Sequence, residues 1–459
     1  MGQRSCLEES AEILLEQFEL ILDHHMPIDE VGFVHPSQFA ELHEDSSISW
    51  SPPAKYWQIL DKACRTDGSG LNCPGNVAVF WYGNHKLAIS MQVVPLLYNA
   101  ALLAHIGAQG RYKRSINTPK YTSSLHTATC EAQYLETDIL KHSRAILILS
   151  PDFGSVWNSR KLVLSREHDL SLFIEELNLS TLILSYSPKS EQAWCHRRWL
   201  IKQIAEKFHD LYDIIDKDSE LVKTIAENSK MNYRAWSHRC WLITHMTKGQ
   251  MFDELKKSRK WAELHVADNS CYHYRRRLIH NLLENSLLKD NKERPSGYKC
   301  HSFNLLKEEL NWNVHLIKLY MGREALWVHR RFLSYYFIKH VTNPIDLGFP
   351  CEVQKGMIHS VDCFLGEERE LLLTCLTIPS HEFSDTVAQA QHAATYMLWM
   401  SKEIILPQEC RFQEKLKEIG DLKTILINTW PGRTVIWESL LDQLPTEVQE
   451  CQICGADSS

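Results

Sequence analysis

One short pattern recurs five times in the chain and restricts its fold more than any other feature. An aromatic residue is followed three positions later by arginine and six positions later by an aliphatic residue. The aromatic residues are Trp157, Trp194, Trp236, Tyr272 and Trp327. Their arginines are Arg160, Arg197, Arg239, Arg275 and Arg330. Offsets of three and six place the three residues on one face of a helix, so the pattern indicates helices rather than strands.

The spacing between the copies gives the size of the repeating unit. The aromatic residues lie 37, 42, 36 and 55 positions apart. A period of about 35 to 45 residues accommodates two helices and two turns, as in an α-hairpin solenoid. We therefore predict an all-α solenoid in which the tryptophans pack the second helix of each hairpin against its neighbours. The arginines would bridge adjacent hairpins through carboxylates or backbone carbonyls.

The repeats divide the chain into three predicted parts. Residues 1–125 would form an N-terminal helical and loop extension, 126–345 the repeats, and 346–459 C-terminal helices with a degenerate capping repeat and a flexible tail. A polar insertion at 289–297 explains the longest spacing and is expected to be a surface loop. The expected helix pairs are 126–149 with 153–166, 169–186 with 190–207, 215–228 with 231–247, 250–267 with 269–284, and 303–320 with 323–340.

Composition narrows the choice of compartment and partner. The net charge of −7 argues against non-specific nucleic-acid binding, because no global positive charge attracts phosphate. The apolar run 87–107 is interrupted by Gln92, Pro95, Asn99 and His105, which favours a buried helix pair over a membrane span. We expect no membrane span.

The 14 cysteines are irregularly spaced, and no signal peptide is recognisable, so we expect reduced thiols in the cytoplasm. The CxxC pair at 451–454 has no second pair, which disfavours a zinc or redox role for it. None of the His, Cys and Asp residues are spaced as metal ligands, and the chain is expected to carry no cofactor.

The motif Trp-x-His-Arg occurs in three copies, the third at Trp327, and the first two carry a resemblance to a known family. These are Trp194-Cys195-His196-Arg197-Arg198, preceded by Pro188-Lys189, and Trp236-Ser237-His238-Arg239. The segment resembles the repeats of protein prenyltransferase α subunits over about residues 126 to 340, and generic tetratricopeptide repeats lack Trp-x-His-Arg. The resemblance implies a right-handed superhelical solenoid of tetratricopeptide-like α-hairpins. It also implies a crescent wrapped around a β subunit, an α-α barrel that holds the catalytic zinc and most of the isoprenoid pocket.

The same division of labour follows from the chemistry. A thiol must lose its proton to attack a prenyl diphosphate at neutral pH, and zinc is the usual means of removing it. Because no metal site is evident here, that step needs a partner chain. The cofactors expected from the resemblance are zinc on the β subunit and geranylgeranyl diphosphate as co-substrate.

The resemblance assigns roles to five residues. Lys189 matches the lysine that approaches the diphosphate, and it follows Pro188 at the expected start of a helix, where free N–H groups favour an anion. Gln192 matches a glutamine that holds the substrate's terminal carboxylate. Asn232, Tyr233 and Arg234 match the next segment facing the isoprenoid site. For all five the alternative is an ordinary surface or packing role.

One residue departs from the family pattern. Glu191 replaces the usual tyrosine, and a carboxylate beside a diphosphate would repel it. Either Glu191 turns away or the site is modified.

We predict that the chain is the α subunit of a heterodimeric protein prenyltransferase, with geranylgeranyl as the favoured lipid. It would link the lipid to a C-terminal cysteine of a trafficking or signalling protein, with a β subunit of the Rab geranylgeranyltransferase type. No Rab-specific insertion is evident, which favours other acceptors. The alternative is a catalytically silent repeat scaffold that binds a β subunit or another protein, which Glu191 favours.

Overall fold

The computed structural model describes residues 6–23, 28–38, 79–117, 125–208, 211–287, 297–342, 351–377, 384–403 and 418–442. It forms two compact units, Met1–Met246 and Thr247–Ser459. Most of the polar insertion at 289–297 and the CxxC pair at 451–454 lie outside the described residues.

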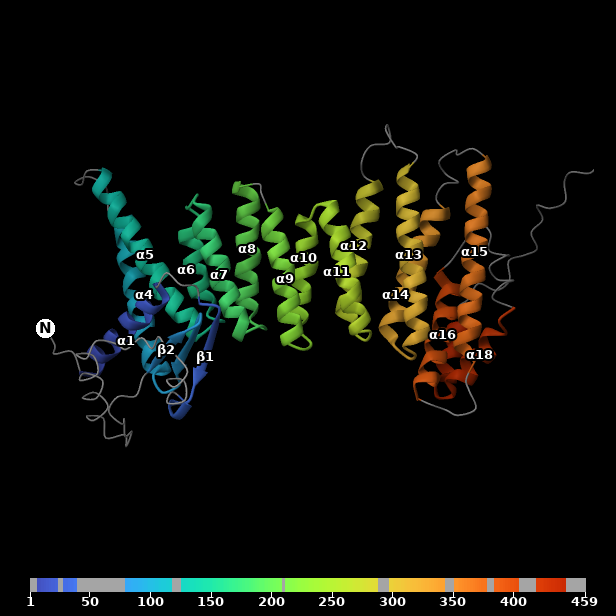
Figure 1. The fold of residues 1–459 in the computed structure, drawn as a ribbon, viewed down its shortest axis with the longest axis horizontal. Coiled ribbons are helices and arrows are strands. Elements are labelled where there is room, and N and C mark those ends of the chain that lie inside the picture. Colours follow the sequence, from blue (N-terminus) through green and yellow to red (C-terminus); the bar gives the residue numbers. More distant parts are fainter. Residues whose placement is uncertain are drawn as a thin grey trace, which may run out of the picture. The chain divides into compact units, whose positions relative to one another are not determined.

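The first unit is a stack of helices with a small sheet at its N-terminal part (Figure 1). Its helices are α1 (Cys6–Asp23), α4 (Val94–Asn117), α5 (Leu125–Leu149), α6 (Gly154–Leu164), α7 (Leu170–Tyr186), α8 (Glu191–Phe208), α9 (Tyr212–Asn228) and α10 (Tyr233–Leu242). Its strands are β1 (Glu30–Val34), β2 (Phe80–Gly83) and β3 (Lys86–Ser90). In Figure 1, α5 to α10 stand side by side in chain order.

The described part of the second unit is helical. Its helices are α11 (Lys248–Leu264), α12 (Asn269–Leu287), α13 (Gly297–Leu319), α14 (Glu324–Thr342), α15 (Cys351–Leu376), α16 (Ser384–Glu403), α18 (Leu422–Thr429) and α19 (Thr434–Leu441). Both units together confirm the predicted all-α helical repeat fold; the handedness of the superhelix stays a prediction. None of the described helices is long and apolar enough to cross a membrane.

The five predicted helix pairs are confirmed. They correspond to α5 with α6, α7 with α8, α9 with α10, α11 with α12, and α13 with α14. Side-chain caps fix several of these helix starts, because they accept hydrogen bonds from N–H groups that the helix leaves free. Asp169 caps α7, Asn232 caps α10, and Thr247 forms a capping box with Gln250 at α11.

The prediction of a helix pair at 87–107 was wrong. Residues 86–90 are strand β3, and a single helix, α4, runs from Val94 to Asn117. β3 is the middle strand of a three-stranded sheet, parallel to β1 and antiparallel to β2. Asn84 and His85 both have positive φ and connect β2 to β3, as in a type I′ hairpin turn.

The sheet packs against the first helix, which makes it part of the core of the first unit. Phe18 of α1 stacks on Phe80 of β2 with ring centroids 5.5 Å apart, and both rings are buried. Leu87 and Ile89 of β3 belong to the same apolar cluster. Leu14, Leu15 and Ile21 of α1 are buried in this cluster too, so one face of the helix packs into the core.

Within each unit, buried arginines join consecutive hairpins, as predicted. Arg197 of α8 donates to the carboxylate of Asp218 in α9, with Nε 2.8 Å from Oδ1. Its Nη1 also donates to the carbonyl of Leu177, 20 residues earlier in its own hairpin, at 2.8 Å. The other such junctions join Arg160 to Glu176, Arg275 to Glu309, and Arg330 to Glu368. In all three the backbone acceptor again lies 20 residues before the arginine.

The same carboxylates hold the residue that precedes the arginine in the motif. His196 Nε2 lies 3.0 Å from Glu176, and His238 Nε2 lies 2.6 Å from Asp218. In the fourth hairpin a tyrosine takes this place, and the Tyr274 hydroxyl donates to Glu254 at 2.7 Å. Glu176 and Asp218 therefore each bind the arginine of the preceding hairpin and the histidine of their own hairpin.

The repeat aromatics pack on the same histidines. Trp157 lies 4.5 Å from the ring of His196, and Trp194 lies 4.7 Å from the ring of His238, centroid to centroid. In the second unit Tyr272 packs on His329 at 5.3 Å. Trp157, Trp194 and Tyr272 thus have the packing role that the sequence predicted, because each contacts the next repeat in its unit.

Burial and charge fix the protonation states in these junctions. Burial alone would raise the pKa of Glu176, but Arg160 and His196 outweigh it and lower that pKa to about 2. The pKa values of Asp218 and Glu309 are also lowered to about 2, because a neighbouring arginine and histidine outweigh the effect of burial. Burial lowers the pKa of His329 to about 4, so the histidine is neutral at pH 7 and the carboxylate is charged.

Replacing Arg197 by alanine is expected to destabilise the first unit by about 3 to 5 kcal/mol, because Asp218 would remain buried without its cation. The matched control is Arg198→Ala, which removes the next arginine, a half-buried one paired at the surface, and is expected to cost about 1 kcal/mol or less. Urea unfolding of the full chain measures both. Equal losses for the two variants would contradict the structural role of the junction.

Acidification is expected to lower the free energy of unfolding. The buried histidines have folded pKa values below the ordinary 6.5, so the unfolded chain takes up protons first and stability falls as the pH drops below about 6.5. For His329 the full effect, reached near pH 4, is about 3 kcal/mol. Glu176 and Asp218, whose pKa values are about 2, become protonated at still lower pH, which lowers the free energy of unfolding further.

Thermal unfolding between neutral pH and pH 4 tests this expectation. His329→Gln should flatten the pH dependence, whereas replacing His168, an exposed histidine, by glutamine should not. A melting temperature that is constant or rises on acidification would show that the buried histidines are not held neutral.

Candidate functional site

The structure places the five predicted site residues at the starts of α8 and α10 and in the loops before them. The loop before α8 contains Pro188 and Lys189, and the loop before α10 contains Asn232. Asn232 Nδ2 donates to the carbonyl of Pro188 at 2.8 Å, and the guanidinium of Arg234 donates to the carbonyl of Lys189. These two bonds fix the starts of α8 and α10 beside each other.

Lys189 lies one residue before the N-cap of α8, as the sequence predicted. Ser190 caps the helix by accepting from the N–H of Ala193, while its hydroxyl donates to Asp152 at 2.6 Å. The side chain of Lys189 is exposed, and its ammonium has no hydrogen bond or ion pair within the described residues. A free cation at a helix start is suited to meeting an anion.

Asn232 is buried and has a structural role that the sequence did not predict. Its Oδ1 accepts from the N–H of Ala235 and caps α10, while its amide nitrogen reaches Pro188. Pro188 also accepts from the indole N–H of Trp194 at 3.0 Å. Asn232 therefore supports the loop that presents Lys189.

Tyr233 and Arg234 lie at the surface beside this loop. Tyr233 is 66% exposed, and the guanidinium of Arg234 lies 5.6 Å from its ring centroid. Met231, with φ of +55°, is 93% exposed on the same turn. Two large side chains that face solvent next to Lys189 could contact a partner or an apolar ligand.

Glu191 does not turn away from the site but is held in it. Its Oε1 accepts from Arg198 Nη2 at 2.9 Å, and its Oε2 lies 2.9 Å from Arg234 Nε. Burial would raise its pKa, but hydrogen bonds from Cys195 and Arg198 and the charges of Arg198 and Arg234 lower it overall. The positive charge predicted for Arg234 is thus paired with a resident carboxylate.

Gln192 occupies the next position of α8 and faces the preceding hairpin. Its Oε1 lies 3.4 Å from the place where a Cβ on Gly154 would be. The Gln192 amide therefore packs against the start of α6. The side chain is half-buried, and its predicted role as a carboxylate ligand stays a prediction.

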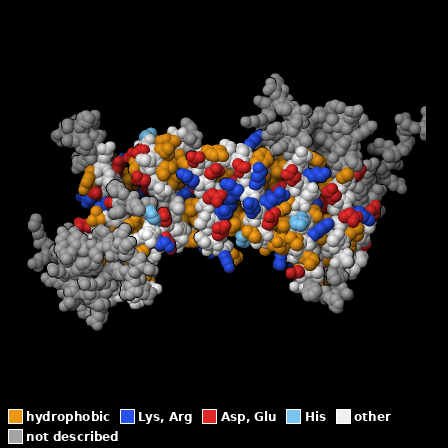
Figure 2. Space-filling view, in the orientation of Figure 1, with side chains coloured by type: hydrophobic (Ala, Val, Ile, Leu, Met, Phe, Trp, Pro, Cys, Tyr) orange, Lys and Arg blue, Asp and Glu red, His pale blue; other side chains and the backbone are white. Residues whose placement is uncertain are grey.

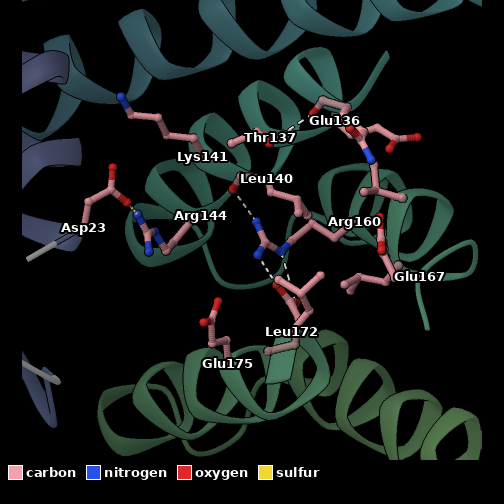
Figure 3. Close-up of a pocket in the computed structure, with 14 residues that line it drawn as sticks. Asp23, Glu136, Thr137, Leu140, Lys141, Arg144, Arg160, Glu167, Leu172 and Glu175 are labelled. Carbon is pink, nitrogen blue, oxygen red and sulfur yellow. Dashed lines mark hydrogen bonds and ion pairs between the residues drawn. The ribbon is translucent and has the colours of Figure 1, made fainter. Parts of the chain in front are cut away.

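A separate pocket of about 410 Å³ lies within the first unit and does not include Lys189. Figure 3 shows Arg160 reaching into it from α6 while it donates to Leu140, and Arg144 pointing to Asp23. Charges of both signs line the pocket, with most of the cations already paired. It is distinct from the loops that carry the predicted residues.

Two features of the site escaped the sequence analysis. Arg198 was not named as a partner of Glu191, although opposite charges seven residues apart lie on the same face two helical turns apart. Asp152 was also missed. It could have been found from its position five residues before Trp157, because Lys189 likewise lies five residues before Trp194. Within the described residues, no group of three or more His, Cys, Asp or Glu side chains is placed to hold a metal ion.

Charge is mixed on the face that Figure 2 displays, where Lys and Arg alternate with Asp, Glu and apolar side chains in both units. No extended patch of one sign is seen on this face. An anion site on this face would therefore be local and built from particular side chains.

Comparison with known proteins agrees with these features. The repeat described as "Protein prenyltransferase alpha subunit repeat" matches residues 173–204, 215–246 and 251–282, which cover most of the pairs α7 with α8, α9 with α10, and α11 with α12. The chain is 28% identical over 324 residues to protein prenyltransferase alpha subunit repeat-containing protein 1 of Homo sapiens, covering 58% of this chain and 79% of that protein.

Two other relatives add to this. The protein of the same name in Danio rerio is 31% identical over 245 residues, covering 44% of this chain and 56% of that protein. The geranylgeranyl transferase type-2 subunit alpha of Rattus norvegicus is 34% identical over 83 residues, which are 17% of this chain and 15% of that subunit. The similarity to a named enzyme subunit is therefore confined to a short segment.

Asn232→Ala is expected to destabilise the first unit by about 1 to 3 kcal/mol, because it removes a helix cap and leaves the Pro188 carbonyl without one of its donors. Hydrogen exchange should speed up at the start of α10 and in the loop that holds Lys189. Tyr233→Ala, which replaces the exposed neighbour, should change stability by less than about 0.5 kcal/mol. If the two variants behaved alike, Asn232 would not be the support of this loop.

Proposed function

This chain is a prenyltransferase α-like repeat protein, and on that premise we propose that it is the α subunit of a heterodimeric protein prenyltransferase. The observation that carries the proposal is the ammonium of Lys189 at the start of α8, which is exposed and has no partner within the described residues. Asn232 fixes the loop that holds Lys189 beside the start of α10. Of the residues that the resemblance assigns to substrate contacts, Tyr233 and Arg234 lie at the surface beside Lys189.

In this proposal the reaction forms a thioether at a C-terminal cysteine of a protein acceptor. The cysteine thiolate attacks the first carbon of the prenyl diphosphate, the carbon–oxygen bond breaks, and the diphosphate leaves with its negative charge. Zinc on the β subunit would lower the pKa of the cysteine thiol, so that it loses its proton at neutral pH. Lys189 stabilises the charge on the leaving diphosphate, a contribution of a few kcal/mol when water is excluded.

The finer parts of the proposal rest on similarity. The relative from Rattus norvegicus is named as a subunit of a geranylgeranyl transferase, which supports geranylgeranyl diphosphate as co-substrate and a β subunit of the Rab geranylgeranyltransferase type. We place the enzyme in the cytoplasm. The relatives that match over the longest segments have names that state no activity. The competing proposal is therefore a silent scaffold that binds a β subunit.

Co-expression with prenyltransferase β subunits is expected to give a stable heterodimer that transfers labelled geranylgeranyl from its diphosphate to peptides ending in cysteine. Farnesyl diphosphate and full-length acceptor proteins serve as parallel arms. A stable complex without transfer to any acceptor would establish the scaffold and refute the enzyme.

In the active complex, Lys189→Ala should slow the single-turnover rate about tenfold to hundredfold while assembly is unchanged, because only the leaving group loses its cation. Lys202→Ala is the matched control, since it removes an exposed lysine of the same helix that pairs with Glu206 instead. An unchanged rate in Lys189→Ala would remove this residue from the mechanism.

A further inference from the structure

The strongest feature outside the proposed mechanism is the pair of arginines around Glu191. The guanidinium of Arg198 comes from the same helix and that of Arg234 from the next hairpin, and each lies 2.9 Å from a different oxygen of the carboxylate. Two guanidiniums that converge on one anionic group are the arrangement proteins use to bind carboxylates and phosphates.

The cluster is accessible to a ligand from solvent. The side chain of Glu191 is 45% exposed, and those of Arg198 and Arg234 are 23% and 31% exposed. Ion pairs at this degree of exposure contribute little to stability, so the carboxylate can be displaced at small cost. Among the described residues, the only other acidic side chain that is hydrogen-bonded to the loop before α8 is Asp152, which accepts from Ser190.

A third cation completes the arrangement. Lys189 precedes Glu191 by two residues, and its backbone carbonyl accepts from Arg234, so the guanidinium of Arg234 lies against the backbone of Lys189. The ammonium of Lys189 has no partner within the described residues. Because the lowered pKa of Glu191 keeps its carboxylate charged at neutral pH, the cluster has three cations and one internal anion.

We propose that Arg198, Arg234 and Lys189 form an anion-binding site for a diphosphate group and that Glu191 is its built-in occupant, which reduces the affinity of the site for external anions. The carboxylate uses both guanidiniums and repels an incoming phosphate. The identity of the anion as a diphosphate rests on the proposed function; the occupation of the site by Glu191 does not.

The second unit offers a matched control. Glu324 and Arg331 stand at the same positions around Trp327 as Glu191 and Arg198 do around Trp194, and Glu324 acts on Arg331 electrostatically. There, however, Gly322 replaces the lysine. Glu324→Gln thus makes the same charge change at an equivalent position that lacks the third cation.

The test is calorimetric titration of the chain alone with inorganic pyrophosphate. Glu191→Gln should bind about tenfold more tightly than the wild type, because a like charge is removed and both guanidiniums are released. Glu324→Gln should bind like the wild type. The double variant Lys189→Ala with Glu191→Gln should lose most of the gain.

Two further arms keep the result interpretable. Glu191→Ala is a second unmasking variant that should also gain affinity, and thermal unfolding checks that each variant folds. Titration with acetate distinguishes a general carboxylate site, which would gain equally for both anions, from a diphosphate site. No gain in Glu191→Gln, or an equal gain in Glu324→Gln, would overturn the proposal.

The experiment is independent of the proposed enzyme activity. It uses no β subunit and no lipid, so an absence of prenyl transfer would leave a positive binding result standing. Conversely, transfer by the wild-type heterodimer together with no gain in Glu191→Gln would refute only the internal occupant.

Discussion

The fold depends on buried carboxylates that are each shared by two consecutive hairpins. Asp218 binds Arg197 from the hairpin before it and His238 from its own hairpin, and all three side chains are almost fully buried. A buried charge without a partner costs several kcal/mol, so neither hairpin can bury these groups alone. The repeats must therefore stack in order, and the motif Trp-x-His-Arg recurs because it supplies the arginine and histidine that bind the shared carboxylates.

The same stacking builds the candidate site. Where consecutive second helices begin, their preceding loops come within hydrogen-bonding distance, and Asn232 and Arg234 bind the backbone of Pro188 and Lys189. The lysine is thus presented by a rigid edge rather than by a loose turn. Precise placement of a cation on a rigid element is what stabilisation of a leaving group needs.

Glu191 connects the two candidate functions. In the enzyme its carboxylate lowers the positive charge available to the diphosphate, and in a scaffold it simply pairs two arginines. The structure shows that the carboxylate lies between Arg198 and Arg234 rather than away from them. The negative charge of Glu191 thus offsets part of the positive charge at this edge, and an external anion that binds both guanidiniums must displace the carboxylate.

The sequence by itself determined the repeat class, the five helix pairs and the bridging role of the arginines, because spacings of three, six and about forty residues admit few other structures. It also indicated that Lys189 stands at a helix start. It did not predict the sheet of β1, β2 and β3, since β1 lies far from its partner strand in sequence and its pairing is a long-range contact. The tertiary structure alone decided that Asn232 is a buried cap and that Glu191 is paired with Arg234, because both depend on a neighbouring hairpin about 40 residues away.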